Sequence, residues 1–268
     1  MFKEAIGILD CGVEGLNILE ELTRKFKNEN FVYINDLKNS PYFNLPEADA
    51  LEFIKANVDR LRKDNIKLLI VANDMIAEIG RDYFNELDIP VFDIISILTE
   101  YVQDNFEQKN IVLFGKNSVI EANLYQKNFK YNRLFNIPSD DLEEIICNKG
   151  LKTSKSFNVT KEAFKQLLGK AVDVVVTSSP FLIKLNTEIE EFVSVGEFTN
   201  FGEIVAKKIY NEFMNLNVKG KGKVKVYSNI EAKKFKYMTY WNPVKYKYID
   251  VDKKVRKLRQ KKFEKITK

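Results

Sequence analysis

The sequence predicts an α/β fold made of two doubly wound halves of similar architecture, each with a parallel sheet, that face each other across a central cleft. Short apolar runs alternate with segments whose apolar residues recur at helical spacing. This alternation begins near residue 5 and restarts near residue 110, which indicates two halves. The chain has 268 residues, 45% of them hydrophobic, enough to build a core for one large or two small domains.

The first half contains three predicted strands, at residues 5–9, 30–34 and 67–72. Predicted helices follow them at residues 15–26, 48–63 and 76–85. The first helix carries Leu16, Leu19, Leu22 and Phe26 on one face. Strands that alternate with helices in this way form a parallel sheet covered on both faces.

The second half repeats the pattern from residue 110. Its predicted strands lie at residues 110–114, 133–137, 172–177 and 192–195. Its predicted helices lie at residues 119–126, 140–148, 160–168, 181–190 and 201–216. Segments 223–227 and 246–251 alternate like strands, and we expect this last part to cross back and close the first half. We therefore assign residues 1–97 plus 209–252 to the first domain, 98–208 to the second, and 253–268 to a basic tail.

Composition excludes several kinds of chemistry. The chain has no histidine, which excludes a histidine general base, a Ser-His-Asp or Cys-His arrangement and a histidine-ligated metal. Cys11 and Cys147 are too few for a disulfide framework or a structural zinc, so we expect no metal, no cofactor and a cytoplasmic location. The chain enters a strand directly after its start and has no apolar run of ~18 residues, so we expect neither a signal peptide nor a membrane span.

Charge is distributed unevenly along the chain. Residues 219–268 hold 18 Lys and Arg against 4 Asp and Glu, a net of +14, whereas the rest of the chain has a net charge of −9. Aromatic residues such as Tyr237, Tyr240 and Trp241 lie just before the tail. Basic charge with aromatics fits nucleic acid or an anionic membrane surface. The simpler interpretation is a solvated tail that balances the acidic body and is dispensable for folding.

Four turns of the chain carry a family resemblance. They read Asp10-Cys11-Gly12-Val13-Glu14-Gly15-Leu16, Pro41-Tyr42-Phe43, Val71-Ala72-Asn73-Asp74 and Thr177-Ser178-Ser179-Pro180. They resemble the Asp-Ser-Gly-Val-Gly-Gly-Leu, Pro-Tyr-Gly, Ala-Cys-Asn-Thr and Gly-Cys-Thr-His-Tyr-Pro turns of the glutamate racemase family. The resemblance runs from about residue 6 to residue 252, and the last turn matches with a register uncertain by one or two residues.

The resemblance implies a reaction that this chain lacks the groups to perform. The family uses two cysteines on opposite faces of the substrate α-carbon, since a thiol can be tuned to exchange protons near neutral pH. Here the first cysteine position is Ala72, and the second falls within residues 177–179, which carry only hydroxyls. We therefore assign no catalytic residue. The resemblance also implies a homodimer and, for an active member, supply of D-amino acids for peptidoglycan.

The resemblance implies a ligand site in the cleft. Its candidate residues are Asp10, Cys11, Pro41, Tyr42, Asn73, Asp74, Thr177, Ser178 and Ser179. Each also has a structural interpretation: Asp10 could fix a turn, Cys11 could be inert, and Asn73 or the two serines could cap helices. Cys147 fits a helical apolar pattern and is interpreted as a core residue.

Glu14 and Asp74 replace a glycine and a threonine of the family near Asp10. A carboxylate there would repel glutamate by ~1–4 kcal/mol, so a neutral or cationic ligand fits better.

Three functions remain open at this stage. The first is a racemase-like protein without two-base catalysis that binds a small molecule or regulates. The second is an amino-acid racemase of altered mechanism that uses Cys11 or Asp10. The third is a scaffold or nucleic-acid-associated protein that acts through its basic end. A cleft filled by side chains such as Phe43 or Met75 would favour the third.

Overall fold

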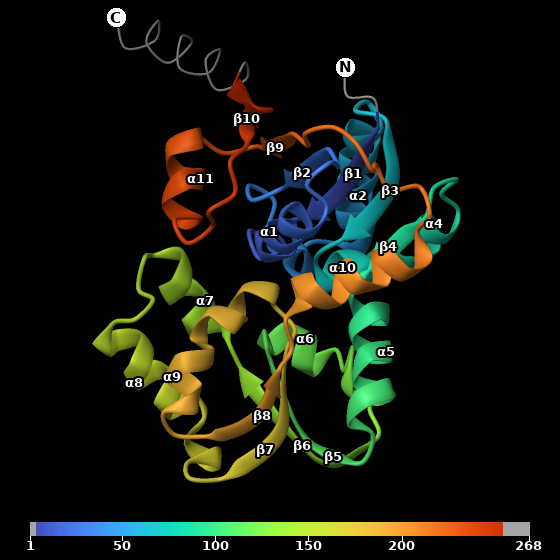
Figure 1. The fold of residues 1–268 in the computed structure, drawn as a ribbon. Coiled ribbons are helices and arrows are strands. Elements are labelled where there is room, and N and C mark those ends of the chain that lie inside the picture. Colours follow the sequence, from blue (N-terminus) through green and yellow to red (C-terminus); the bar gives the residue numbers. More distant parts are fainter. Residues whose placement is uncertain (1–3, 254–268) are drawn as a thin grey trace, which may run out of the picture.

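The computed structural model describes residues 4–253 and contains two parallel β-sheets, one above the other in Figure 1. The strand order of the first sheet is β10-β9-β2-β1-β3-β4, and that of the second is β6-β5-β7-β8. Every strand pair in both sheets is parallel. The α/β class and the two doubly wound halves predicted from the sequence are confirmed.

The first sheet combines the two ends of the described chain. Its strands are β1 (Ala5–Asp10), β2 (Phe31–Asn35), β3 (Ile66–Val71), β4 (Val91–Asp93), β9 (Val224–Ser228) and β10 (Lys247–Asp250). The helices around it are α1 (Leu16–Lys25), α2 (Glu47–Arg62), α3 (Asp74–Ile79), α4 (Arg81–Asn85), α10 (Phe201–Glu212) and α11 (Ala232–Met238). Because β9 pairs with β2, the last part of the chain crosses back and extends the first sheet, as the sequence predicts.

The second sheet is built from one continuous stretch of chain. Its strands are β5 (Lys109–Gly115), β6 (Tyr131–Pro138), β7 (Ala171–Thr177) and β8 (Ser194–Phe198). The helices of this stretch are α5 (Ile94–Phe106), α6 (Asn117–Glu121), α7 (Asp140–Cys147), α8 (Ser154–Ala163) and α9 (Asn186–Glu190). Short 3-10 turns occupy Tyr42–Asn44, Gln126–Asn128, Lys165–Leu167 and Pro180–Leu185. The domain boundaries proposed from the sequence stay a prediction.

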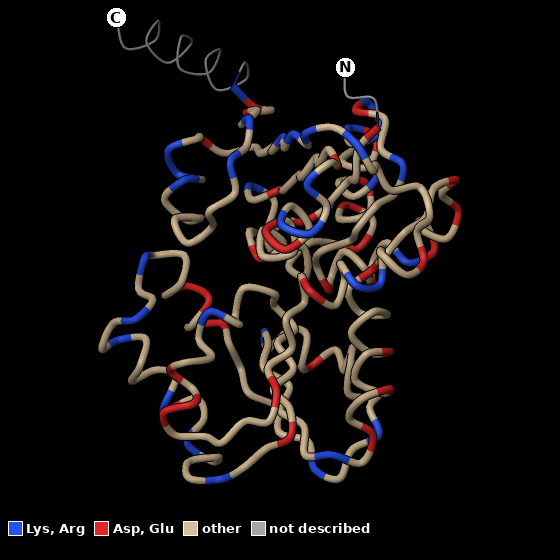
Figure 2. The backbone as a smooth tube through the Cα atoms, viewed as in Figure 1, with Lys and Arg blue, Asp and Glu red and all other residues tan. Residues whose placement is uncertain are grey.

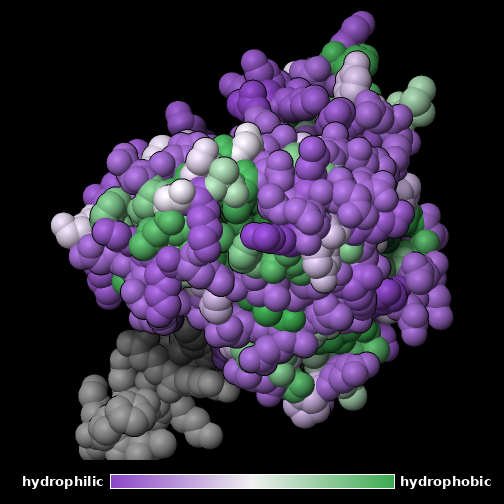
Figure 3. All heavy atoms as spheres, turned by 90° about the horizontal axis from the view of Figure 1, so that it is seen from below, coloured by the Kyte–Doolittle hydropathy of each residue, from purple (hydrophilic) through white to green (hydrophobic). Residues whose placement is uncertain are grey.

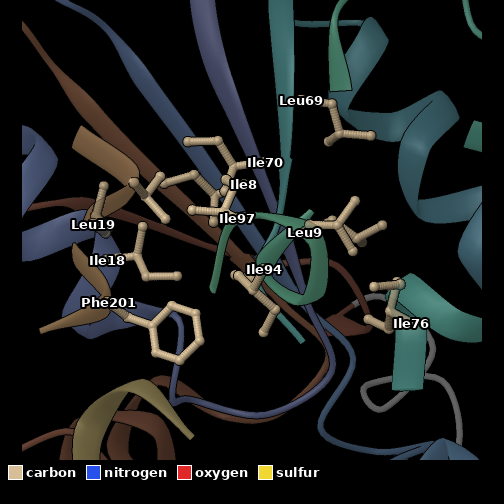
Figure 4. Close-up of a cluster of buried hydrophobic side chains, with 14 of the residues drawn as sticks. Ile8, Leu9, Ile18, Leu19, Leu69, Ile70, Ile76, Ile94, Ile97 and Phe201 are labelled. Carbon is tan, nitrogen blue, oxygen red and sulfur yellow. The ribbon is translucent and has the colours of Figure 1, made fainter. Parts of the chain in front are cut away.

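Apolar side chains pack on both faces of each sheet. Figure 4 shows Ile8 and Leu9 of β1 among side chains of β3, α1, α5 and α10. In the second sheet, Ile111 and Leu113 of β5 join this large core, whereas Val112 and Phe114 join a separate one. Successive side chains of a strand point to opposite faces, so a strand that is apolar at every position is buried on both.

Several helices differ from the sequence-based expectation; for example, the helix expected at residues 181–190 is a 3-10 turn followed by the short helix α9. Helix α5 was missed, although Asp93 caps it by accepting a hydrogen bond from the backbone N–H of Ser96 at 2.9 Å. The helix expected at residues 76–85 is divided into α3 and α4 at Gly80, where a Cβ would lie 2.4 Å from the Phe84 ring. Helix α8 begins before the expected residue 160, because Thr153 and Ser156 form a capping box.

The surface of the molecule is mostly hydrophilic where it is viewed from below, with scattered hydrophobic patches (Figure 3). Among the described residues, no helix has both the length and the apolar character needed to cross a membrane. Apart from Lys253, the predicted basic tail lies outside the described residues.

Candidate functional site

Polar side chains gather at the carboxyl ends of the strands, where ligands of open α/β sheets bind. In the first sheet, Asp10 ends β1 and residues 72–74 follow β3. In the second sheet, Lys116 follows β5, Ser139 follows β6, and Thr177 ends β7 just before Ser178 and Ser179. Side chains from these turns contact one another across the two halves. We call the following side chains the polar cluster: Asp10, Glu14, Asp74, Lys116, Tyr125, Ser139, Glu143 and Ser179.

Asp10 fixes the first turn. Its carboxylate accepts hydrogen bonds from the backbone N–H groups of Gly12 (2.7 Å) and Gly15 (2.9 Å) and from the Tyr33 hydroxyl (2.6 Å). The side chain is completely buried. Burial, followed by the nearby charge of Glu14, raises the pKa of Asp10 to about 7, although the three donors oppose this shift. The turn role considered for Asp10 is therefore present, alongside a carboxyl group that titrates near neutral pH.

An ion-paired bridge of Glu14, Lys116 and Glu143 joins the two halves. The Lys116 ammonium pairs with the Glu14 carboxylate and lies 3.2 Å from Glu143 Oε2. Glu14 comes from the turn after β1, whereas the other two residues come from the second half. Ser139 and Ser179 donate hydrogen bonds of 2.9 and 2.6 Å to Glu143 Oε1. Every charged group of this bridge thus has partners inside the protein.

The electrostatics of the bridge follow from burial and pairing. Burial opposes the ionised form of Glu14, but the pairing with Lys116 outweighs it and lowers the Glu14 pKa. Burial also opposes the charged form of Lys116, yet Glu14 and Glu143 raise its pKa well above the ordinary value. For Glu143, burial is the larger effect, and its pKa is raised. Glu14 and Lys116 are therefore an ionised pair.

The second turn contributes Asp74 to the polar cluster. Its carboxylate accepts a hydrogen bond from the Tyr125 hydroxyl, a second connection between the halves. Burial raises the pKa of Asp74 to about 7 despite this hydrogen bond and the neighbouring Lys116. Asn73 instead caps α3 by accepting from the backbone N–H of Ile76 at 3.2 Å, so its structural interpretation is correct.

At the third turn, the hydroxyls of Thr177 and Ser179 form hydrogen bonds within the protein. The backbone N–H of Thr177 donates to Thr199 Oγ1 at 3.0 Å, and the Thr177 hydroxyl donates to the Thr199 carbonyl at 3.2 Å. Ser178 is completely buried, and its hydroxyl has no hydrogen-bond partner among the described residues. The expectation that Ser179 caps the following helix is wrong, because Ser179 makes no capping hydrogen bond and binds Glu143 instead.

Comparisons with known proteins identify relatives over most of the chain. The glutamate racemase of Clostridium acetobutylicum is 27% identical over 239 residues, covering 85% of this chain and 93% of that protein. The glutamate racemase of Thermoanaerobacter pseudethanolicus is 24% identical over 234 residues, covering 82% and 87%. No family model matches the chain.

Solved structures agree with these sequence relatives. Glutamate racemase isoform RacE1 from Bacillus anthracis superposes with a TM-score of 0.80 at 20% identity, covering 94% of this chain and 98% of that one. The glutamate racemase from Thermus thermophilus, solved with β-chloro-D-alanine, also gives 0.80, at 18% identity and with 93% and 97% covered. This chain is a relative of the glutamate racemases, similar to them in sequence and in fold over most of its length.

The turns after β3 and β7, where the sequence resemblance leads us to expect cysteines, carry no thiol at Ala72 or at residues 177–179. Ala72 is buried directly after β3, and a Cβ placed on Gly15 would lie 2.7 Å from the Ala72 methyl and 2.9 Å from Asp10 Oδ2. Ala72 therefore adjoins the Asp10 carboxylate with no exchangeable proton to offer. At the other turn, the Ser179 hydroxyl donates to the carboxylate of Glu143, whereas within residues 4–253 the Ser178 hydroxyl has no hydrogen-bond partner.

The two cysteines of the chain are poor proton-transfer groups. Burial, followed by the charges of Asp10 and Glu14, raises the pKa of Cys11 far above its ordinary value. Burial raises the pKa of Cys147 to about 12. Both side chains are free thiols, and both are neutral at physiological pH.

Tyr42 of the candidate site forms hydrogen bonds with residues outside the polar cluster. Its buried hydroxyl donates to Asp36 Oδ2 at 2.7 Å and accepts from Asn57 at 3.3 Å. Its neighbour Pro41 is exposed. Phe43, expected as a possible filler of the cleft, is 45% exposed. Phe43 therefore does not fill the space between the two halves, whose contacts near Asp10 include the ion pairs of Lys116 with Glu14 and Glu143.

Lys116, Glu143, Tyr125 and Ser139 are the members of the polar cluster that the sequence reasoning missed. A lysine directly after a predicted strand was the available signal, because that position lies at the ligand-binding edge of a parallel sheet. Five cavities of about 260–580 Å³ along residues 4–253 are lined by other segments, and Asp10, Asn73 and Ser178 line none of them.

Proposed function

We propose that this chain is a glutamate racemase-like protein that does not racemise glutamate by two-thiol proton transfer and that acts by binding a small molecule or by regulation. The observation that carries the proposal is the absence of a thiol after β3 and after β7, at Ala72 and at residues 177–179. The thiols of Cys11 and Cys147 do not substitute, because their raised pKa values keep them protonated.

The charge of the polar cluster also argues against glutamate as the ligand. The polar cluster holds four carboxyl groups, on Asp10, Glu14, Asp74 and Glu143, against one ammonium, that of Lys116. A dicarboxylate entering this cluster would meet repulsion of ~1–4 kcal/mol from each close ionised carboxylate. Lys116 is already paired with two glutamates, so it offers little compensation. A neutral or cationic ligand, such as an amine, is the class that this cluster favours.

The bridge suggests how such a ligand could act as a signal. Glu14 and Lys116 hold the two halves together, and an amine that paired with the carboxylates would compete with the Lys116 ammonium. Binding would then be coupled to separation of the halves. We expect this protein to work in the cytoplasm, where both thiols stay reduced, and as a homodimer.

A second candidate is an amino-acid racemase or isomerase that uses carboxyl groups for proton transfer. It is favoured by one observation, the pKa values of about 7 for Asp10 and Asp74 at the carboxyl ends of neighbouring strands. A carboxyl group poised near the working pH can serve as a general acid or base. In that case the chain would keep the class of reaction through which its relatives supply D-amino acids for the cell wall.

One experiment separates these candidates. Individual L- and D-amino acids, including glutamate, aspartate, lysine and ornithine, are incubated with pure protein in D₂O, and exchange of the α-proton is followed by NMR. The binding proposal expects no exchange, and it expects chemical-shift changes on titration with a neutral or cationic amino acid. Enzyme-dependent exchange that is lost in Asp74→Asn would establish the second candidate. Exchange of glutamate that is lost in Cys11→Ala would overturn the loss of thiol chemistry itself.

A further inference from the structure

The end of the described chain carries a concentration of positive charge that the polar cluster does not use. Residues 219–253 contain ten lysines against Glu231, Asp250 and Asp252, a net of +7. Figure 2 shows lysines of this segment on α11 and along the strands next to it. In Figure 1, helix α11 lies above α7 at the edge of the molecule, whereas α10 lies at its centre.

Helix α11 and the turn after it present a basic and aromatic face to solvent. Lys233, Lys236 and Tyr237 lie on the helix and Tyr240 in the turn, and all four are exposed, Tyr237 by 46% and Tyr240 by 38%. On the opposite side, Phe235 is fully buried, with its ring centroid 5.9 Å from that of Tyr246 and 5.3 Å from that of Tyr248. The buried phenylalanine anchors the helix, so the tyrosines and lysines are held outward on a fixed support.

Contacts from the second half hold the two tyrosine rings in place. The Lys149 ammonium lies 4.8 Å from the ring centroid of Tyr237 and 5.9 Å from that of Tyr240. The Tyr240 hydroxyl accepts a hydrogen bond of 3.4 Å from the backbone N–H of Leu151. Rings that are already ordered lose less entropy when a planar group stacks on them.

Within residues 4–253, the lysines of this face have no ion-pair partner. Lys233, Lys234, Lys236, Lys245 and Lys247 form no ion pair with any residue from 4 to 253. By contrast, Lys208 of α10 pairs with both Glu100 and Glu212. A depression of about 360 Å³ beside α11 is lined by two of these lysines together with tyrosines and polar residues: Lys236, Thr239, Tyr240, Asn242, Val244, Lys245 and Tyr246.

We propose that this surface, defined by Lys233, Lys234, Lys236, Tyr237, Tyr240 and Lys245, binds single-stranded nucleic acid. Unpaired lysines supply the sequence-independent attraction to phosphates, and exposed tyrosine rings supply platforms on which unpaired bases stack. A ligand that carries negative charge but no planar rings would need only the lysines. The ordered tyrosines beside a base-sized depression are what single out a ligand with exposed planar rings.

The test uses the full chain and a fluorescein-labelled oligo(dT) of 20 nucleotides, with binding followed by anisotropy between 50 and 300 mM NaCl. Lys233→Gln/Lys234→Gln/Lys236→Gln is expected to weaken binding on the order of tenfold at 100 mM salt and to reduce the salt slope by about two. Tyr237→Ala/Tyr240→Ala is expected to weaken binding on the order of tenfold while leaving the salt slope unchanged.

A matched variant controls for the loss of charge. Lys161→Gln/Lys165→Gln/Lys170→Gln removes three exposed lysines from the α8 side of the molecule and should leave binding within about twofold. Circular dichroism and thermal melting establish that each variant is folded. Equal losses in both lysine variants, unchanged binding in the α11 variants, or no binding at 50 mM salt would each overturn the proposal. A membrane surface would be the ligand instead if the protein bound no oligonucleotide but cosedimented with vesicles of 30% phosphatidylglycerol in phosphatidylcholine, and if the α11 lysine variant lost this cosedimentation.

Discussion

Lys116, the first residue after β5, forms a partly buried ion pair with Glu14, which lies 102 positions earlier in the turn after β1. The pair joins the two halves at the carboxyl ends of the strands, the edge at which open α/β sheets bind ligands. Glu14 also accepts a hydrogen bond of 2.7 Å from the backbone N–H of Val13, so its carboxylate folds back over the turn. A Cβ on Gly12 would lie only 1.7 Å from Glu14 Oε2, so the glutamate in this position requires the glycine two residues before it.

Lys116→Met should destabilise the protein by about 3–5 kcal/mol, because it leaves two buried glutamates without their cation. Urea unfolding followed by fluorescence measures the change. The double variant Lys116→Met/Glu14→Gln should recover a large part of the loss, since it removes the uncompensated charge. Lys165→Met is the control, because Lys165 pairs with Glu162 at the exposed surface, and its unfolding midpoint should not move. A Lys116→Met protein as stable as wild type would show that the bridge does not hold the halves together.

Asp74 should make stability fall as pH rises. Its folded pKa of about 7 is above its ordinary value of 3.8, so the stabilisation is complete below about pH 4 and is lost as pH rises through 7. Asp74→Asn keeps an acceptor for the Tyr125 hydroxyl but cannot ionise, and it should exceed wild type by up to about 4 kcal/mol at pH 8.

The measurement for Asp74 is the difference in melting temperature between variant and wild type from pH 5 to pH 8. This difference should increase with pH for Asp74→Asn. For Asp82→Asn, on the exposed side of α4, it should stay constant. A constant difference in both variants would mean that Asp74 is ionised throughout this range.

Glutamate racemisation should be absent in the wild-type protein. Neither turn has a thiol, and the carboxylates of Glu14 and Asp74 oppose a dicarboxylate substrate. Chiral chromatography of glutamate after incubation with pure protein is the measurement, with a sequence relative of established activity as positive control. Turnover above about one per second, within the range of ordinary enzymes, would refute the prediction.

The fold could be predicted from the sequence because parallel strands that are buried on both faces are apolar at nearly every position. Runs such as residues 67–72 are apolar at every position, and β3 is found at Ile66–Val71. Helix α5 was harder to detect, since its apolar start at Ile94 and Ile95 continues the apolar run of β4. Its cap, Asp93 with Ser96, was present in the sequence but was not used.

The candidate site was predicted only in part, for a physical reason. Asp10 and Asp74 could be identified from the turns that contain them, and the charge of Glu14 was recognised as unfavourable for glutamate. The cation that accepts this charge comes from another sheet, and no local pattern relates Lys116 to Glu14. Likewise, Ser179 looks like a helix cap in sequence, but it makes no capping hydrogen bond, and its hydroxyl donates to the carboxylate of Glu143, which lies 36 positions away.

Restoring both thiols should not restore racemisation of glutamate. Ala72→Cys/Ser178→Cys supplies two candidate bases, and, because both positions are buried, circular dichroism must establish that the variant is folded. The new thiol at position 72 would adjoin the Asp10 carboxylate, which would raise its pKa rather than activate it. The bridge would still occupy the cleft. Adding Glu14→Gly/Lys116→Ala/Asp74→Thr removes the bridge and the opposing charge, so only this combination should gain measurable glutamate turnover or α-proton exchange. Efficient turnover by the two-cysteine variant alone would show that the missing thiols, and not the ion-paired bridge, are the whole obstacle.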